Sequence, residues 1–271
     1  MKIIILALYV LLSTTISAEI HEIHHFSEFE DAIAPLKSTE WLLFDIDYTL
    51  TEPSHPALQM GVIRQNKQRF RDEQAKFTTA QKQLVPVVMI TQAASQLTDP
   101  SIPMLIQKLQ DQNIPILGFT AIDTSVLPQI GSIPAWRFNE LKNLGINFNS
   151  HSGPFPKESL EFSDLPSFRG TFPIYENGIL YCNVSPSKGA VLAAFMDYVA
   201  LEPSRVILID DTLENLQSVE EKLAISGIPF LGIHFKIQHD NVNLPKVTDE
   251  EWNSVWEKIR QRVELIIPAL K

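Results

Sequence analysis

The sequence predicts an α/β protein whose mainly parallel sheet is flanked by helices. Two observations predict it: short apolar runs without alternation, which are typical of strands buried on both faces, and helical patterns between those runs. Strand–helix alternation of this kind favours a parallel sheet. In such sheets ligands bind at the carboxyl ends of the strands, and the polar residues of this chain gather there.

Four apolar runs are the expected strands of the sheet. They are Trp41–Asp45, Ile114–Thr120, Val206–Asp210 and Ile228–Phe235. The segment around Asn177 and Gly178 differs, because an Asn-Gly pair between two β-prone runs is a strong hairpin signal. We therefore expect residues 173–182 to form a β-hairpin.

Apolar residues at helical spacing predict the helices that connect these strands. The expected helical faces are Ile102–Leu109 before the second strand, Val191–Val199 before the third and Leu213–Leu223 after it. Gly227 is well placed to end the last of these helices. A capping box formed by Thr248 and Glu251 predicts the start of a C-terminal helix.

Composition and charge limit the classes of protein to which this chain can belong. The 271 residues are 45% hydrophobic and 20% charged, which are ordinary values for a soluble globular chain. A net charge of −10 argues against nucleic acid as the main partner. The single cysteine, Cys182, excludes a disulfide within the chain and is expected to be a small buried side chain without a catalytic role.

Residues 1–18 have the pattern of a secretory signal peptide. Lys2 precedes an apolar stretch, Ile3–Leu12, and small or polar residues then lead to Ala18. The stretch is shorter than the roughly 20 apolar residues that cross a bilayer, so we expect cleavage after Ala18 and no stable membrane anchor. The mature protein is then exported, and a bacterial periplasm or a secreted fate fits.

The segment between the first two strands is longer than a plain crossover needs. It contains a polar helical run, Val62–Gln83, with several basic side chains. We interpret residues 52–111 as a small, largely helical cap inserted over the candidate site. A solvated helix on the outer face of the core is the alternative. Residues 19–51 and 112–271 are then the core domain.

The first strand ends abruptly in two carboxylates, Asp45 and Asp47, separated by one residue. Like carboxylates at close range disfavour each other's ionised form, so burying both requires a counter-charge. Mg²⁺ prefers oxygen ligands and would supply that charge.

Three further polar positions follow in order along the chain. Thr120 ends the second strand, and Lys188 stands at the start of a helix in Ser185-Pro186-Ser187-Lys188-Gly189. Asp210 and Asp211 end the third strand. Together with Asp45-Ile46-Asp47-Tyr48-Thr49, these segments resemble the four motifs of the haloacid dehalogenase (HAD) superfamily. The resemblance covers about 19–51 and 102–235.

This resemblance implies a HAD-like Rossmannoid core and a Mg²⁺-dependent phosphatase that acts on a small phosphorylated substrate. Asp45 would attack phosphorus and form an aspartyl-phosphate, while Asp47 would be the general acid/base. Thr120 would donate a hydrogen bond to a phosphoryl oxygen. Lys188 would hold the phosphoryl charge and the nucleophile in place.

The resemblance also implies a set of magnesium ligands. They are Asp45, the backbone carbonyl of Asp47 and an acid of the fourth motif. By the family's register Asp211 binds the metal and Asp210 supports it through water, although the reverse assignment stays open. Glu214 or Asn215 is a further candidate near the metal.

Other readings of the same residues stay open. One is a binding protein that keeps the fold without turnover, and another is a phosphotransferase that uses the same site. Within the superfamily the chain is similar to an exported group of poorly characterised bacterial proteins. Many relatives carry an arginine just after the second motif. Here Ile122 and Asp123 follow Ala121, so the sequence offers no arginine there.

Overall fold

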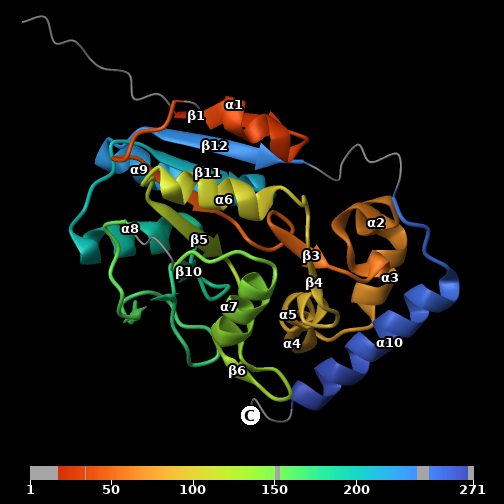
Figure 1. Cartoon of the computed structure of the whole chain (residues 1–271). Coiled ribbons are helices and arrows are strands. Elements are labelled where there is room, and N and C mark those ends of the chain that lie inside the picture. Colours follow the sequence, from red (N-terminus) through yellow and green to blue (C-terminus); the bar gives the residue numbers. More distant parts are fainter. Residues whose placement is uncertain (1–17, 34, 150–152, 237–243, 268–271) are drawn as a thin grey trace, which may run out of the picture.

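The computed structural model describes residues 18–33, 35–149, 153–236 and 244–267. Its centre is an eight-stranded sheet in which the strands have the order β1-β12-β11-β2-β5-β10-β9-β8 (Figure 1). The strand bounds are β1 Ala18–Ile23, β2 Trp41–Phe44, β5 Ile116–Thr120, β8 Leu160–Glu161, β9 Ile174–Glu176, β10 Ile179–Tyr181, β11 Val206–Asp210 and β12 Phe230–Phe235. Neighbours from β1 to β10 are parallel, whereas β9 and β8 are added antiparallel. The mainly parallel α/β fold expected from the sequence is therefore confirmed.

The four predicted strands correspond to β2, β5, β11 and β12, and the predicted hairpin corresponds to β9 and β10. Asn177 and Gly178 both have positive φ, 54° and 77°, as the two-residue turn of a type I′ hairpin requires. A Cβ at Gly178 would lie 2.6 Å from the carbonyl oxygen of Phe148, which restricts this position to glycine.

The sequence patterns did not predict strand β1, which is the edge strand of the main sheet next to β12. It pairs in parallel with β12, and Ile20 lies opposite Gly232. Its sequence, AEIHEI, is half polar, unlike the uninterrupted apolar runs that marked the central strands.

Helices cover both faces of the sheet. Along β2, Leu42 and Phe44 belong to one apolar cluster, whereas Trp41 and Leu43 belong to the other, as the alternation of a strand dictates. Helices α1 (Phe29–Ile33), α6 (Ile102–Asp111) and α7 (Ile133–Asn143) contribute to the first cluster. Helices α8 (Lys188–Val199) and α9 (Leu213–Ser226) contribute to the second. The predicted helices α6, α8 and α9 are thus confirmed, and α9 ends at Gly227 in the left-handed conformation.

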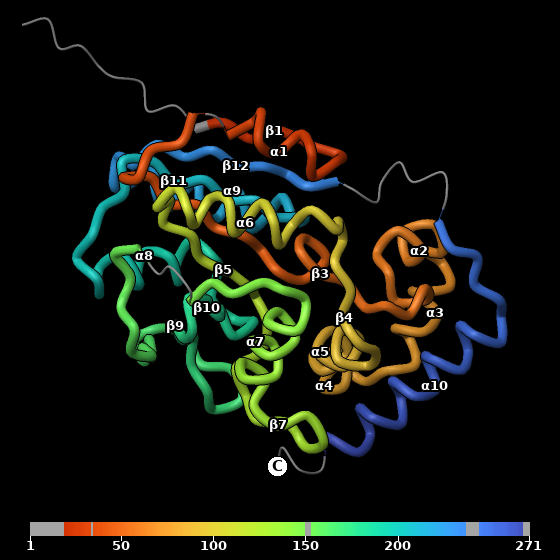
Figure 2. Tube along the Cα trace, viewed as in Figure 1, coloured from red at the N-terminus to blue at the C-terminus, as the bar shows by residue number. Residues whose placement is uncertain are grey.

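A helical unit lies beside the carboxyl side of the sheet. Figure 2 shows the chain leaving β2, passing through β3 to α2–α5 and returning through β4 to α6. The bounds are β3 Thr51–Pro53, η2 Pro56–Leu58, α2 Met60–Gln65, α3 Lys67–Ala75, α4 Thr79–Lys82, α5 Val85–Ile90 and β4 Ser95–Leu97. The expected helical run Val62–Gln83 is therefore divided among three short helices.

The C-terminal helix α10 (Asp249–Ile266) begins at the predicted capping box of Thr248 and Glu251. It contacts α5 and η2 and lies against the α2–α5 unit in Figure 1. The assignment of residues 52–111 to a cap and of residues 112–271 to the core domain stays a prediction.

Three small elements complete the described chain: η1 Phe26–Glu28, β6 Val126–Leu127 and β7 Gly131–Ser132. The predicted signal peptide lies outside the described residues except for Ala18, the first residue of β1. In the described part of the chain, none of the helices combines the length and apolar character needed to span a membrane.

Candidate active site

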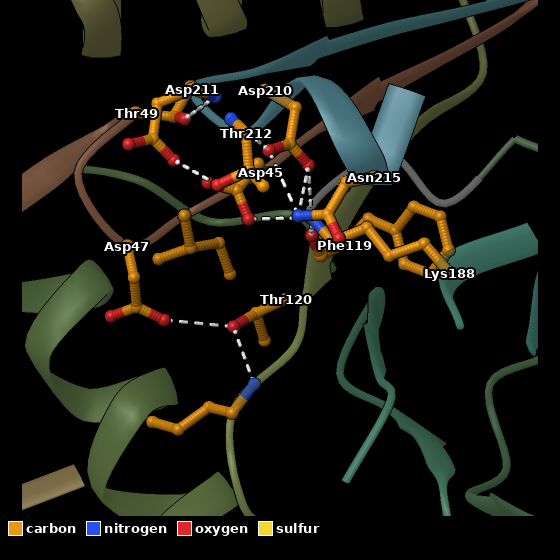
Figure 3. Close-up of polar contacts among 12 residues, drawn as sticks. Asp45, Asp47, Thr49, Phe119, Thr120, Lys188, Asp210, Asp211, Thr212 and Asn215 are labelled. Atoms are coloured by element: carbon orange, nitrogen blue, oxygen red, sulfur yellow. Dashed lines mark hydrogen bonds and ion pairs between the residues drawn. The ribbon is translucent and has the colours of Figure 1, made fainter. Parts of the chain in front are cut away.

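The predicted site residues come from the carboxyl ends of neighbouring parallel strands. Asp45 directly follows β2, Thr120 ends β5 and Asp210 ends β11. Lys188 opens α8, which follows β10. Because parallel strands end at the same edge, these side chains gather there. Figure 3 shows Asp45, Asp210 and Lys188 pointing toward one another, while the Thr120 hydroxyl points toward Asp47.

Lys188 is the central cation of the site. Its Nζ donates to Asp45 Oδ1 at 2.6 Å, to Asp210 Oδ2 at 2.7 Å and to the backbone carbonyl of Phe119 at 2.5 Å (Figure 3). Burial by itself lowers the pKa of the Lys188 ammonium, but the carboxylates of Asp210 and Asp45 together raise it above its usual range. The lysine is therefore a fixed positive charge with all three donors used.

A close contact between two helices fixes the position of Lys188. The next residue, Gly189, lies so near α9 that an added Cβ would be 1.9 Å from the carbonyl oxygen of Ser218. The Gly189 N–H donates to Ser218 Oγ at 3.2 Å. Ser187 caps the helix by accepting a hydrogen bond from the Ala190 N–H. Glycine after the lysine thus allows α8 to start where the ammonium reaches both acids.

Three acids form a compact cluster around this lysine. Single carboxylate oxygens of Asp45, Asp210 and Asp211 all lie within 4.8 Å of one another. Asp45 Oδ2 is buried and accepts no hydrogen bond from the described residues. Burial, followed by the Asp210 carboxylate, raises the pKa of Asp45 well above its usual range. The same two causes raise the pKa of Asp211 to about 7.

This cluster has the chemistry of a divalent-cation site. Three carboxylates face one another, and the lysine compensates part of their charge. An orphaned buried oxygen on Asp45 is the kind of acceptor that a hard cation satisfies. The residues present therefore fit Mg²⁺.

The two acids of the fourth motif have different surroundings. Asp210 accepts hydrogen bonds from the Thr212 N–H at 2.8 Å and from Asn215 Nδ2 at 3.1 Å, in addition to Lys188. Asp211 accepts from Thr212 Oγ1 at 3.2 Å, and its backbone N–H donates to Thr49 Oγ1. The Asp210 carboxylate is the more fully occupied of the two, which leaves Asp211 with more free acceptor capacity.

Asp47 lies outside the acid cluster and is held by different partners. Thr120 Oγ1 donates to Asp47 Oδ2 at 2.9 Å (Figure 3), and Arg137 donates to Asp47 Oδ1. The Thr120 hydroxyl also accepts a hydrogen bond from the Ile122 N–H at 3.1 Å. Arg137, with 1% of its side chain exposed, also donates to Thr51 Oγ1 at 3.3 Å.

The turn that carries Asp47 is strained. Tyr48 has φ 65°, a left-handed conformation that bulky residues rarely adopt. The turn is closed by hydrogen bonds from the Tyr48 N–H to the Thr51 carbonyl and from the Leu50 N–H to the Ile46 carbonyl. Strain of this kind persists where surrounding contacts fix it, often at functional sites.

A cavity of about 610 Å³ opens over these residues. Its lining includes Asp45, Asp47 and Asp211 together with residues of α2, α3 and α5. From the basic run of α2 and α3, Arg64 approaches the acids, with Nη2 3.7 Å from Asp211 Oδ2. Arg69 instead pairs with Asp249 at 2.9 Å, at the start of α10.

Comparison with known proteins identifies the family of this chain. Residues 22–264 match the family model described as Protein of unknown function (DUF2608). The chain belongs to this family.

Three rickettsial relatives, each an uncharacterized protein, match part of this DUF2608 protein. The Rickettsia felis protein is 30% identical over 158 residues, which cover 57% of this chain and 51% of the relative. The Rickettsia bellii protein is 29% identical over 152 residues, covering 55% and 51%. The Rickettsia conorii protein is 29% identical over 158 residues, covering 57% and 51%. The chain spans about half the length of these curated relatives.

Among solved structures, a hydrolase of the haloacid dehalogenase-like family from Streptococcus pneumoniae is similar, with a TM-score of 0.42 and 17% identity. The match covers 81% of this chain and 92% of that one. A likeness at this level does not assign an activity to the DUF2608 protein.

In this DUF2608 protein, Lys188 hydrogen-bonds to Asp45 and Asp210, and Asp211 joins this network through Thr212. The other two predicted residues, Asp47 and Thr120, form a separate hydrogen-bonded pair. Arg137 was missed, because it lies far from every motif along the chain. A sequence signal exists: Ile133, Arg137 and Leu141 recur at a spacing of four, which places the arginine on the buried face of α7.

Proposed function

We propose that this protein is a Mg²⁺-dependent phosphatase of the haloacid dehalogenase type that hydrolyses phosphate monoesters through a phosphorylated Asp45. The observation that carries the proposal is the contact of one buried lysine with two strand-end acids. Lys188 donates to Asp45 and Asp210, while the second oxygen of Asp45 is left without a partner.

The metal would be held by Asp45, the backbone carbonyl of Asp47 and Asp211, with Asp210 in support. Bound Mg²⁺ supplies positive charge that offsets the charge of the phosphoryl group and lets a carboxylate approach it. Asp210 is assigned the supporting role because Lys188, Thr212 and Asn215 already occupy its oxygens.

In the first step the Asp45 carboxylate attacks phosphorus, and the bond between phosphorus and the leaving oxygen breaks. Asp47 gives its proton to that oxygen, so the alcohol departs neutral. Lys188 holds Asp45 in position during the attack and stabilises negative charge near it. Thr120 donates its one hydroxyl hydrogen to Asp47 in the free protein and would donate it to a phosphoryl oxygen when substrate binds.

In the second step Asp47 removes a proton from water, and the water oxygen attacks the phosphorylated Asp45. The bond between phosphorus and the Asp45 oxygen breaks, which releases inorganic phosphate and restores both carboxyl groups. Arg137 holds the Asp47 carboxylate in place through both steps, because its guanidinium donates to Oδ1 of that carboxylate.

Export and the cap are part of the same proposal. The pattern of residues 1–18 supports secretion to a periplasm or beyond, where a small phosphorylated molecule would be the substrate and no nucleic acid is expected. The α2–α5 unit borders the cavity and would act as the cap that contacts the leaving group.

Hydrolysis of p-nitrophenyl phosphate tests the chemistry. The protein would be assayed with Mg²⁺ and with EDTA, alongside Asp45→Asn and the control Asp164→Asn, an exposed aspartate far along the chain from the motifs. We expect turnover that needs both Mg²⁺ and Asp45 and that the control retains. Activity that survives Asp45→Asn would reject the assigned nucleophile. A folded, Mg²⁺-binding protein without turnover would favour a binding role.

A further inference from the structure

Two chemically different groups of side chains line the cavity over the acids. Asp45, Asp47 and Asp211 are acidic. The side chains contributed by α2, α3 and α5 are largely apolar, and we call seven of them the apolar wall. It consists of Met60, Ile63, Phe70, Val85, Val87, Met89 and Ile90.

The apolar wall belongs to the same cavity as the proposed nucleophile. Met60 and Phe70 are only half-buried, so part of their apolar surface is available to a ligand. Gln74, Lys82 and Gln83 also line the cavity. The hydroxyl groups of a sugar or nucleoside placed against the apolar side chains themselves would lose water without gaining partners there, which is unfavourable. A hydrocarbon chain placed there would bury apolar surface, which is favourable.

We propose that the leaving group of the substrate is an apolar alkyl alcohol, so that the substrate is an alkyl phosphate with its chain on the apolar wall. The proposal rests on the proposed function for the position of the phosphoryl group at Asp45. A cavity of about 610 Å³ has the size of a small-molecule site.

Binding measurements test the apolar wall without requiring turnover. Methyl-, butyl- and hexylphosphonate, which cannot lose the chain by hydrolysis of an ester, would be titrated calorimetrically into the protein with Mg²⁺. The dissociation constant should fall by roughly threefold to fourfold for each added methylene that the wall buries. A dissociation constant independent of chain length would overturn the proposal.

A matched pair of variants locates the effect. Met60→Gln keeps the length of the side chain and adds a polar group to the wall, so hexylphosphonate should bind roughly tenfold more weakly while methylphosphonate binds as before. Met104→Gln is the control, because Met104 lies on α6 and is 77% exposed. Equal loss for both phosphonates in Met60→Gln, with an unchanged urea unfolding midpoint, would reject the wall as the binding surface.

Hydrolysis separates this inference from the proposed function. Hexyl phosphate, methyl phosphate and glucose 6-phosphate would be compared by kcat/KM, and the hexyl ester should be preferred. Turnover of all three without preference for the hexyl ester would reject the apolar leaving group and keep the phosphatase. Chain-length-dependent binding without any turnover would keep the apolar wall and reject the phosphatase.

Discussion

Arg137 of α7 donates a hydrogen bond to Oδ1 of Asp47, although the two residues are 90 positions apart in the chain. Thr120 donates to the other oxygen of the same carboxylate. Asp47, the proposed general acid/base, is therefore held at both carboxylate oxygens by residues of α7 and β5, which lie outside the first motif. Arg137 is a positioning residue in this scheme.

Replacing Arg137 by Gln should lower kcat by roughly tenfold to a hundredfold while KM changes little, because the Asp47 carboxylate loses one of its two anchors. Arg137→Lys should recover part of kcat, since an ammonium keeps the charge but not the planar geometry of a guanidinium. Steady-state kinetics measure both. Lys142→Gln, on an exposed position of the same helix, is the control. Unchanged kcat in Arg137→Gln would contradict the positioning role.

Lys188→Met should lower the free energy of unfolding by about 3–5 kcal/mol, because it leaves Asp45 and Asp210 buried without their cation. Urea unfolding in EDTA measures this change. Adding Asp45→Asn to Lys188→Met should restore part of the loss, since one of the two uncompensated charges is then removed. Additive losses in the double variant would show that the lysine and Asp45 do not interact.

Gly189→Ala and Ala200→Gly, near the two ends of α8, should change stability in opposite directions. The first places a Cβ 1.9 Å from the Ser218 carbonyl oxygen, so α8 must move and the free energy of unfolding should fall by roughly 1–3 kcal/mol. The second relieves a left-handed alanine with φ 52°, and stability should rise by roughly 0.5–1 kcal/mol. Thermal unfolding compares them.

Gly189→Ala and Ala200→Gly should also differ in turnover, because Lys188 is the neighbour of Gly189 and not of Ala200. Gly189→Ala should also reduce turnover, because the displaced helix carries the lysine away from Asp45. Ala200→Gly should leave turnover as it is, since its change lies at the opposite helix end. Full activity in a destabilised Gly189→Ala protein would show that the site tolerates movement of α8.

Without Mg²⁺, the free energy of unfolding should fall as pH rises from about 4 to about 7. The pKa of Asp211 is raised to about 7 in the folded protein, so between these values the folded chain holds a proton that the unfolded chain has released. Loss of that proton-linked stabilisation is complete above the folded pKa. Urea unfolding in EDTA at pH 5 and pH 8 measures the difference.

Mg²⁺ should weaken this pH dependence, because a cation at the acid cluster favours the ionised carboxylates. Asp211→Asn should weaken it as well, since the group that titrates is removed. The same slope in wild type and Asp211→Asn would assign the proton to another residue.

The central strands and several helices follow directly from local patterns. Uninterrupted apolar runs mark β2, β5 and β11 because each is buried on both faces, and an Asn-Gly pair marks the β9–β10 turn. The capping box at Thr248 marks the start of α10 in the same way. Each signal acts over a few residues and needs no partner elsewhere in the chain.

Strand β1 and the α2–α5 unit are different cases. Half of β1 is polar, so its place in the sheet depends on pairing with β12 and not on an apolar run. The polar run Val62–Gln83 is predicted to be helical, yet it is divided among three short helices that line the cavity. One of them, α3, packs on α10 through Phe70 and Trp256. Long-range packing decides both outcomes.

The sequence by itself determined the parallel α/β core and the strand ends where Asp45, Thr120 and Asp210 would stand, because backbone periodicity and strand direction are local properties. Only the tertiary structure decided that Arg137 anchors Asp47, and that Met60 and Phe70 face the same cavity as the acids. Such contacts join segments that lie far apart in the chain. Their geometry depends on how the helices pack on the sheet, which residue spacing does not encode.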